Sequence, residues 1–362
     1  MSCNWGTNRP PADLSSQLQG PKCSPAGASA IWPFQTSGEL EKCLRPVVGP
    51  SSGYCQPPCP ARGLLQRRAE LRDAVAPWRQ NRWMLTRSSG YLSLRPGTAP
   101  PAVEGLQSDG YAVLDAVFEG EELAALRTDV ERVFEEYPPD ERGDPPAQSA
   151  SFRHEMLNRS SLVQWAIGNL RILEVVEPLL GEDCHVIANT AWRQASGDNQ
   201  HLGCFWHIDG GPHVPRDPSV PWDPRIPYPV FAIAAHIYLW DCPIEAGPTG
   251  VIPGSHMSGQ APPMERLADD HLQWEDRGAM PIVARAGDVA LFVSDVWHRR
   301  LPPRTGDPGR MFIQCHYGRR DLAQRIRPTS EVNQLSEDAV ARARSRRERT
   351  LVGLHPLGFY DG

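Results

Sequence analysis

Hydrophobic and polar positions change their period along the chain. Between residues 123 and 137 apolar side chains recur every three or four positions, which predicts an amphipathic helix that ends at Pro138-Pro139. Two further helices are predicted over about 160–167 and 170–180. From residue 184 the pattern becomes short apolar runs separated by Gly, Pro and Asp, which is typical of strands. The predicted strands cover residues 110–114, 184–194, 204–209, 230–240, 280–286, 288–293 and 310–317.

Many short strands with turn signals predict a mainly β protein with flanking helices, built as a sandwich or jelly roll rather than from βαβ units. The chain contains no Gly-rich phosphate loop and no nucleophile elbow. Within the strand 231–240, every second residue from Phe231 to Leu239 is apolar. We expect the alternate face, which carries His236 and Tyr238, to line the interior of a barrel.

The first 83 residues differ in composition from the rest. They contain both lysines of the chain, five of its nine cysteines and 11 prolines, without apolar periodicity. Such a segment buries too little surface to offset its ordering entropy, so we interpret residues 1–83 as a disordered or non-native extension. The folded domain is predicted over residues 84–362, with a core at about 103–320 and a helical tail at 321–362. Ser336 is a plausible N-cap in that tail.

Charge and hydropathy exclude several classes of protein. The net charge is -6, and residues 84–362 carry 27 basic against 38 acidic side chains, which argues against a nucleic-acid partner. No run of about 18 apolar residues is present, so we predict no membrane span. The start lacks the pattern of a signal peptide, and we expect a cytoplasmic protein with reduced cysteines. The oligomeric state is not readable from the sequence.

Trp206-His207-Ile208-Asp209 is the first candidate for chemistry. In a strand, residues i and i+2 point to the same face, so His207 and Asp209 can reach one metal ion. This spacing alone is a weak signal, but Trp297-His298 supplies a second histidine near the end of another predicted strand. Two histidines and one carboxylate form the facial triad of non-haem Fe(II) oxygenases, which leaves open positions on the iron. We therefore predict a metal site at His207, Asp209 and His298.

Arg310 follows His298 by twelve residues and begins a predicted strand. A planar guanidinium grips a carboxylate through two parallel hydrogen bonds. An arginine beside the iron is what anchoring the far carboxylate of 2-oxoglutarate requires. On its own, Arg310 is better explained by a surface ion pair; its place in the ordered set favours the cosubstrate.

Six motifs give the chain a resemblance to the phytanoyl-CoA dioxygenase family of Fe(II)/2-oxoglutarate oxygenases, over about residues 103–320. They are Asp109-Gly-Tyr-Ala-Val-Leu114, Trp206-His-Ile-Asp209, Gly247-Pro-Thr-Gly-Val-Ile-Pro-Gly-Ser-His256, Ala286-Gly-Asp-Val-Ala-Leu-Phe292, Trp297-His298 and Arg310. The resemblance implies a double-stranded β-helix, a cupin-like jelly roll. It also implies Fe(II) on His207, Asp209 and His298, and 2-oxoglutarate on Arg310 with a further contact near His236.

The resemblance further implies an O2-dependent oxidation of a C–H bond with release of succinate and CO2. Halogenating relatives lack the carboxylate that this chain keeps at Asp209, which favours hydroxylation. The family often has a small hydroxyl residue two positions after the distal histidine, where this chain has Arg300. The acidic core argues against an acyl-CoA and favours a small organic metabolite as substrate.

Arg193, on a strand leading to the site, is interpreted as a substrate contact or as a member of an ion pair. His213, just beyond Asp209, is interpreted as a substrate contact or as a residue without a role. His213 lies in a proline-rich segment, 212–229, where proline recurs every third residue. This period is typical of a polyproline II rod. The rod either forms a wall of the site or is only a surface connection. Two alternative functions stay open. One is a non-catalytic metal- or ligand-binding jelly roll, and the other is a zinc hydrolase, which the lack of an evident general base disfavours.

Overall fold

The structure is a computed structural model, and it describes residues 100–138, 151–196, 203–217, 219–220, 222, 228–322 and 335–355. The predicted extension 1–83 lies outside the described residues, as do residues 218, 221 and 223–227 of the proline-rich segment. The helices are α2 (Pro101–Ser108), α3 (Gly120–Glu136), α5 (Met156–Arg159), α6 (Ser161–Ala166), α7 (Leu170–Leu180), α8 (Glu337–Arg342) and α9 (Arg346–Leu351), with 3-10 turns η2 (Ile244–Ala246), η3 (Ser255–Ser258) and η4 (Met264–Arg266). The strands are β1 (Tyr111–Leu114), β2 (Phe152–His154), β3 (His185–Gln194), β4 (Ala232–Tyr238), β5 (Thr249–Val251), β6 (Met280–Pro281), β7 (Val289–Val293), β8 (His298–Arg300) and β9 (Arg310–Gly318).

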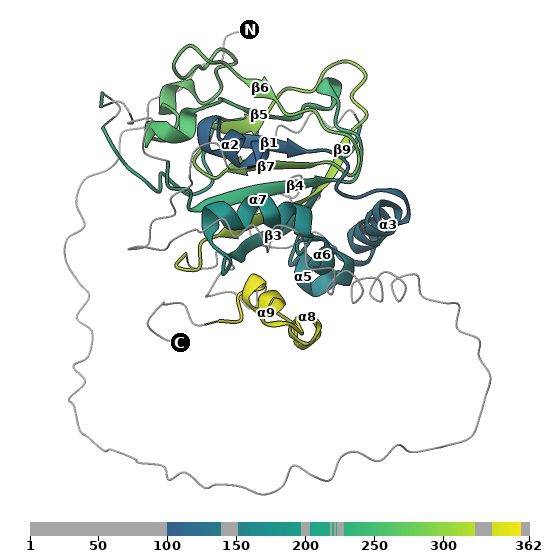
Figure 1. Cartoon of the computed structure of the whole chain (residues 1–362). Coiled ribbons are helices and arrows are strands. Elements are labelled where there is room, and N and C mark those ends of the chain that lie inside the picture. Colours follow the sequence, from purple (N-terminus) through teal and green to yellow (C-terminus); the bar gives the residue numbers. More distant parts are fainter. Residues whose placement is uncertain are drawn as a thin grey trace, which may run out of the picture. The chain divides into compact units, whose positions relative to one another are not determined.

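Two antiparallel sheets form the core. The larger has the strand order β1-β7-β4-β9-β3-β2, and the smaller has the order β6-β5-β8. Strands that are not consecutive in sequence lie side by side in both sheets, so several connecting segments run from one sheet to the other. This arrangement confirms the predicted jelly roll, and Figure 1 shows β5 and β6 on the opposite side of the large sheet from α7.

The central strands are buried on both faces. In β4, Ile233 and Ile237 pack outward with the helices, whereas Ala234 and Tyr238 pack inward with Phe292 of β7 and other side chains between the sheets. Each strand therefore divides its side chains between two cores, as the alternation rule requires. The prediction that His236 and Tyr238 share the inner face is confirmed.

Helices cover the outer face of the large sheet. Buried side chains of α2, α3, α6 and α7 join those of β4, β7 and β9 in one apolar cluster. The predicted helix 170–180 coincides with α7, whose buried stripe includes Ile172, Val176 and Leu180. Among the described residues, no helix is both long and apolar enough to cross a membrane.

The C-terminal segment packs against the same helical layer. Ser336 caps α8 as predicted, because its hydroxyl accepts a hydrogen bond from the Ala339 amide. Arg347, in the arginine-rich part of this segment, is only partly exposed. Its guanidinium lies 2.8 Å from the Glu177 carboxylate of α7 and also donates to the backbone carbonyl of Cys184. The arginine thus ties α9 to the core.

Two predicted strands are much shorter than expected. Residues 204–209 form only one bridge, in which His207 pairs with His298, and the run 280–286 contains the two-residue β6. β5 and β8 were not predicted, because a strand of three residues is too short to show an alternation of apolar and polar side chains. The small sheet is thus held by pairing between distant segments rather than by long apolar strands.

Candidate active site

The backbones of His207 and His298 are paired directly. Each residue donates its amide hydrogen to the carbonyl of the other, at 3.0 Å in both directions. The two imidazole rings consequently lie side by side, with centroids 4.3 Å apart. The Asp209 amide donates to the carbonyl of Ser294 at 2.8 Å. This hydrogen bond holds the backbone of Asp209, two residues after His207, so that both side chains point to the same face. Two strand-like segments that are far apart in sequence therefore present three side chains to one point.

Asp209 lies between the two histidines. Its Oδ1 is 3.9 Å from His207 Nε2, and its Oδ2 is 3.5 Å from His298 Nε2. One ligand atom from each of the three residues can be chosen so that all lie within 4.8 Å of one another, a spacing that suits one metal ion. No other cluster of this kind occurs among the described residues. The structure thus brings together the three residues predicted as metal ligands.

Hydrogen bonds to the backbone set the tautomers of both histidines. His207 Nδ1 lies 2.7 Å from the carbonyl of Phe205, and His298 Nδ1 lies 2.9 Å from the carbonyl of Val296. A carbonyl only accepts, so each Nδ1 donates. In the neutral form of each imidazole the Nε2 lone pair is then available to a metal. This donor set, two oriented imidazoles and one carboxylate, fits Fe(II).

Electrostatics keep the carboxylate ionised. Burial raises the pKa of Asp209, but the positive charges of His298 and His316 outweigh this effect and hold the pKa well below its ordinary value. Partial burial and the neighbouring His298 lower the pKa of His207 to about 4, so this imidazole is neutral near pH 7. A neutral imidazole and an ionised carboxylate are the protonation states that bind metal.

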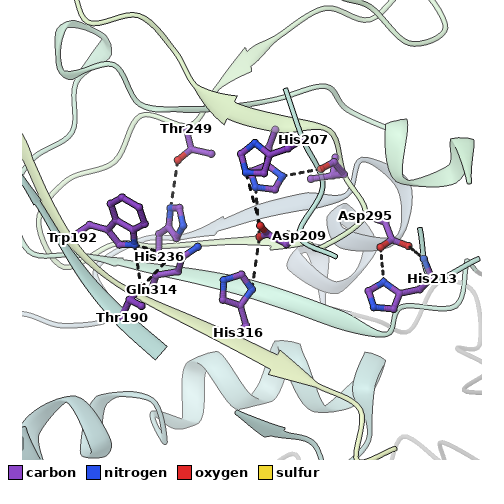
Figure 2. A network of polar contacts seen from close by, with 12 residues as sticks. Thr190, Trp192, His207, Asp209, His213, His236, Thr249, Asp295, Gln314 and His316 are labelled. Carbon is purple, nitrogen blue, oxygen red and sulfur yellow. Dashed lines mark hydrogen bonds and ion pairs between the residues drawn. The ribbon is translucent and has the colours of Figure 1, made fainter. Parts of the chain in front are cut away.

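His316 on β9 is a site residue that sequence reasoning missed. Its Nδ1 lies 3.7 Å from Asp209 Oδ2, and Figure 2 shows Asp209 between His316 and His207. The signal was available in the strand that begins at Arg310. Arg310, Gln314 and His316 occupy alternate positions and therefore share the inner face.

Arg310 enters the interior from the beginning of β9. Its guanidinium is buried, and it donates from Nε to Gln194 Oε1 and from Nη1 to the Gly247 carbonyl at 3.0 Å. No carboxylate of the described residues lies within the ion-pair distance of 4.0 Å. A buried cation without a direct ion pair is costly, so this position suits the carboxylate of a ligand.

Gly247 is required at this turn for conformational reasons. It ends η2 with a φ of 64°, and a Cβ there would come within 2.5 Å of the Leu301 carbonyl. Only glycine takes this left-handed conformation at such close approach without strain. The turn places the Gly247 carbonyl where Arg310 reaches it.

His236 lies on the neighbouring strand and faces the same interior. Its Nδ1 is 3.4 Å from the hydroxyl of Thr249, and its buried Nε2 has no hydrogen-bond partner in the described part of the chain. Burial and the nearby charge of Arg310 hold the pKa of His236 well below its ordinary value, so the ring is neutral. A polar group of a ligand can satisfy the Nε2 atom, which fits a 2-oxoacid between His236 and Arg310.

A second polar network lines the interior between β3 and β9. The Trp192 indole donates to Gln314 Oε1 at 2.8 Å, and the hydroxyl of Thr190 lies 3.2 Å from the same oxygen. Figure 2 shows this group beside His236. Because Gln314 Oε1 receives both donors, its orientation is set by the network.

The two residues predicted as substrate contacts lie in different places. Arg193 is on the outer face of β3, with its guanidinium 4.5 Å from the ring centroid of Phe134 in α3. The structure therefore does not bring it to the metal cluster. His213 stays close to the site. Its backbone amide and its Nδ1 both donate to the carboxylate of Asp295. Asp295 directly follows Ser294, whose carbonyl accepts the hydrogen bond from the Asp209 amide.

A solved structure with bound iron shares this fold. The chain matches EctD from S. alaskensis with bound Fe, with a TM-score of 0.50 and 20% identity over 63% of this chain and 80% of that one. It also matches the epimerase SnoN in complex with Fe3+, alpha ketoglutarate and nogalamycin RO, with a TM-score of 0.49 and 17% identity over 65% and 89% of the two chains. At 20% sequence identity, the similarity to EctD shows the fold alone.

The sequence comparison identifies the family. The comparison with curated protein sequences finds no match. The family described as Phytanoyl-CoA dioxygenase (PhyH) matches residues 106–312, which is more than half of the chain and contains all three predicted metal ligands and Arg310. The predicted enzyme class and the predicted cofactors, iron with 2-oxoglutarate and O2, are thereby confirmed. The chain belongs to the phytanoyl-CoA dioxygenase family and is an Fe(II)/2-oxoglutarate-dependent oxygenase.

Proposed function

We propose that this enzyme hydroxylates a C–H bond of a small organic metabolite and converts 2-oxoglutarate into succinate and CO2. The observation that carries the proposal is the cluster of His207, Asp209 and His298, because its two oriented Nε2 atoms and one ionised carboxylate leave open positions on a bound metal. When bound, Fe(II) with 2-oxoglutarate and O2 supplies the oxidising chemistry.

The chain's own residues bind and orient the cosubstrate in this proposal. Arg310 pairs with the far carboxylate of 2-oxoglutarate, and His236 offers its buried Nε2 to another polar group of the molecule. Both side chains sit on rigid neighbouring strands, β9 and β4, which limits the entropy lost on binding. Phe312 of β9 and Phe292 of β7 pack on the His236 ring and keep water from it.

The substrate approaches on the side of His207 and His213. The His207 side chain is partly exposed, whereas His298 is buried, so the cluster opens towards solvent on the His207 side. His213 donates from Nδ1 to Asp295, which leaves its Nε2 as an acceptor for a substrate hydroxyl or amine. We keep His213 as a substrate contact and do not keep Arg193, because Arg193 lies on the outer face of its strand.

Product analysis with purified protein tests this function. Fe(II), 2-oxoglutarate and a panel of small polar metabolites are incubated in air, and succinate is measured together with the mass of each metabolite. Hydroxylation predicts one succinate for each product that is one oxygen atom heavier. A product that is isomeric or two hydrogens lighter contradicts hydroxylation and indicates epimerisation or ring closure instead. Metal and 2-oxoglutarate binding without succinate, with or without any metabolite, supports the non-catalytic alternative.

A further inference from the structure

Asp295 is a buried carboxylate that binds His213 through both of its oxygens. Its Oδ2 accepts a hydrogen bond from the His213 backbone amide at 3.0 Å, and its Oδ1 accepts one from the ring Nδ1 at 2.5 Å. The Tyr228 phenol lies near the same carboxylate, and burial together with the charge of Asp295 raises the pKa of Tyr228, so the phenol stays neutral. An ionised carboxylate only accepts, so Nδ1 of His213 carries the hydrogen, and the neutral ring offers Nε2 as an acceptor.

The surroundings hold the imidazole of His213 in one orientation. A Cβ at Gly211 would lie 2.3 Å from Asp295 Oδ1, so any side chain at this position would displace the carboxylate. The His213 ring also stacks on the ring of Phe231, with centroids 5.4 Å apart and planes at 5° to each other. The glycine therefore lets the carboxylate approach one edge of the imidazole, while Phe231 supports its face.

The pair of His213 and Asp295 lies beyond the metal cluster, away from the cosubstrate end. Arg310 begins β9, and His316 lies near the end of this strand, beside Asp209. The antiparallel β4 begins where β9 ends, and His213 stacks on the residue that precedes β4. Figure 2 shows His213 on the opposite side of Asp209 from His236. This position suits a contact with the substrate rather than with 2-oxoglutarate.

Nε2 of His213 is open to a ligand. It has no hydrogen-bond partner within the described part of the chain, and the side chain is partly exposed, whereas Asp295 is buried. We propose that Asp295 is a positioning residue that makes His213 Nε2 an acceptor, and that the substrate presents an N–H or O–H group to it. The inference rests on the proposed function, in which the substrate approaches at His213, and it adds the chemical class of the recognised group. A group that can only accept, such as an ether or a tertiary amide, gains no hydrogen bond there.

Asp295→Asn gives a result that a purely structural role does not. The backbone amide of His213 can only donate, so the oxygen of the new carboxamide is expected to turn towards it. The NH2 group then faces Nδ1 and donates, which forces the neutral ring to carry its hydrogen on Nε2. Nε2 thereby changes from an acceptor into a donor, and the preference for donor-bearing ligands is expected to be lost or reversed.

Asp288 provides a matched control. It is also a buried aspartate, and each of its oxygens accepts a hydrogen bond from one backbone amide at 2.7 Å, those of Ala116 and Arg285. Asp288→Asn therefore removes a similar buried charge without touching a histidine. A changed tautomer and ligand preference in Asp295→Asn alone separate positioning of His213 from a general loss of packing.

The experiment measures the tautomer and the binding of small probes. Full-length protein with 15N-labelled histidine is loaded with 2-oxoglutarate and with Zn(II) in place of Fe(II), and NMR at mildly alkaline pH, assigned with His213→Gln, locates the ring hydrogen. The probes are 2-pyrrolidone with N-methyl-2-pyrrolidone, and phenol with anisole; in each pair the methyl group removes the donor. The unaltered protein is expected to carry the hydrogen on Nδ1 and to bind a donor-bearing probe about threefold to tenfold more tightly than its methylated partner.

Three results overturn the inference. The first is a hydrogen on Nε2 in the unaltered protein. The second is an unchanged tautomer and preference in Asp295→Asn, or an unchanged preference in Gly211→Ala if Asp295→Asn does not fold, or an equal change in Asp288→Asn. The third is the lack of any preference for a donor-bearing probe, including the case in which no probe binds.

The product screen separates this inference from the proposed function. If hydroxylation is found but the probes show no preference, only the role of Asp295 and His213 fails. If the preference is found but no metabolite gains an oxygen atom, the proposed function fails and the recognition of a donor at His213 stands.

Discussion

Replacement of Asp209 by asparagine tests the metal site most directly. Asp209→Asn keeps the shape of the side chain and removes its negative charge, so the effect is not caused by a cavity. The carboxylate is largely buried, at 17% exposure, and lies within 4 Å of both histidine Nε2 atoms. A metal ion bound there replaces the protonated histidines as the positively charged partner of this carboxylate.

The magnitude follows from the loss of a buried charge partner. Removing one member of a buried ion pair costs about 3–5 kcal/mol because the other charge is left uncompensated. Since about 1.4 kcal/mol corresponds to a tenfold change, the Kd for Fe(II) is expected to rise by about two to four orders of magnitude. Succinate production is expected to fall to background at iron concentrations that saturate the unaltered enzyme.

The assay is an anaerobic titration with Fe(II), supported by melting temperatures with and without the metal. Metal binding to the folded state raises the melting temperature, and this rise is expected to disappear in Asp209→Asn. Asp295→Asn is the control, because Asp295 is also a buried aspartate that pairs with a histidine, but it is not in the metal cluster. Equal Fe(II) affinity in Asp209→Asn and the unaltered protein would refute the ligand assignment, and an equal loss in Asp295→Asn would make the effect nonspecific.

Three further outcomes are expected. Arg310→Leu should raise the Kd for 2-oxoglutarate about tenfold to a hundredfold and leave Fe(II) binding nearly intact; unchanged 2-oxoglutarate affinity would place the anchor elsewhere. Burial and the neighbouring His355 lower the pKa of His185 to about 4 from an ordinary value of 6.5, so the unfolded chain takes up this proton first as the pH falls. Stability should therefore drop by about 1–3 kcal/mol between pH 6.5 and pH 4, and urea unfolding of His185→Gln should show a flatter pH profile; an identical profile would contradict the assignment. Finally, residues 84–362 alone should keep the melting temperature within a few degrees and retain succinate production, and a larger fall would show that residues 1–83 contribute to the fold.

The local pattern of the chain determined the long elements and the metal-binding motif. α3, α7, β3, β4, β7 and β9 were predictable because an amphipathic stripe or an alternating strand is a property of consecutive residues. The same alternation placed His207 and Asp209 on one face and put His236 on the inner side of β4. These inferences need only the neighbours in sequence, so they did not depend on how the sheets pair.

Only the tertiary structure decided which side chains meet. His298 reaches His207 because two segments 91 residues apart pair their backbones, and no local signal encodes that pairing. Arg193 was expected near the site, but which face of β3 looks inward depends on its pairing with β9 and on the bulge between Val186 and Ala188. For the same reason the sequence marked Arg300 only as unusual. Its burial follows from the pairing of β8 with β5, which places Arg300 directly opposite Thr249.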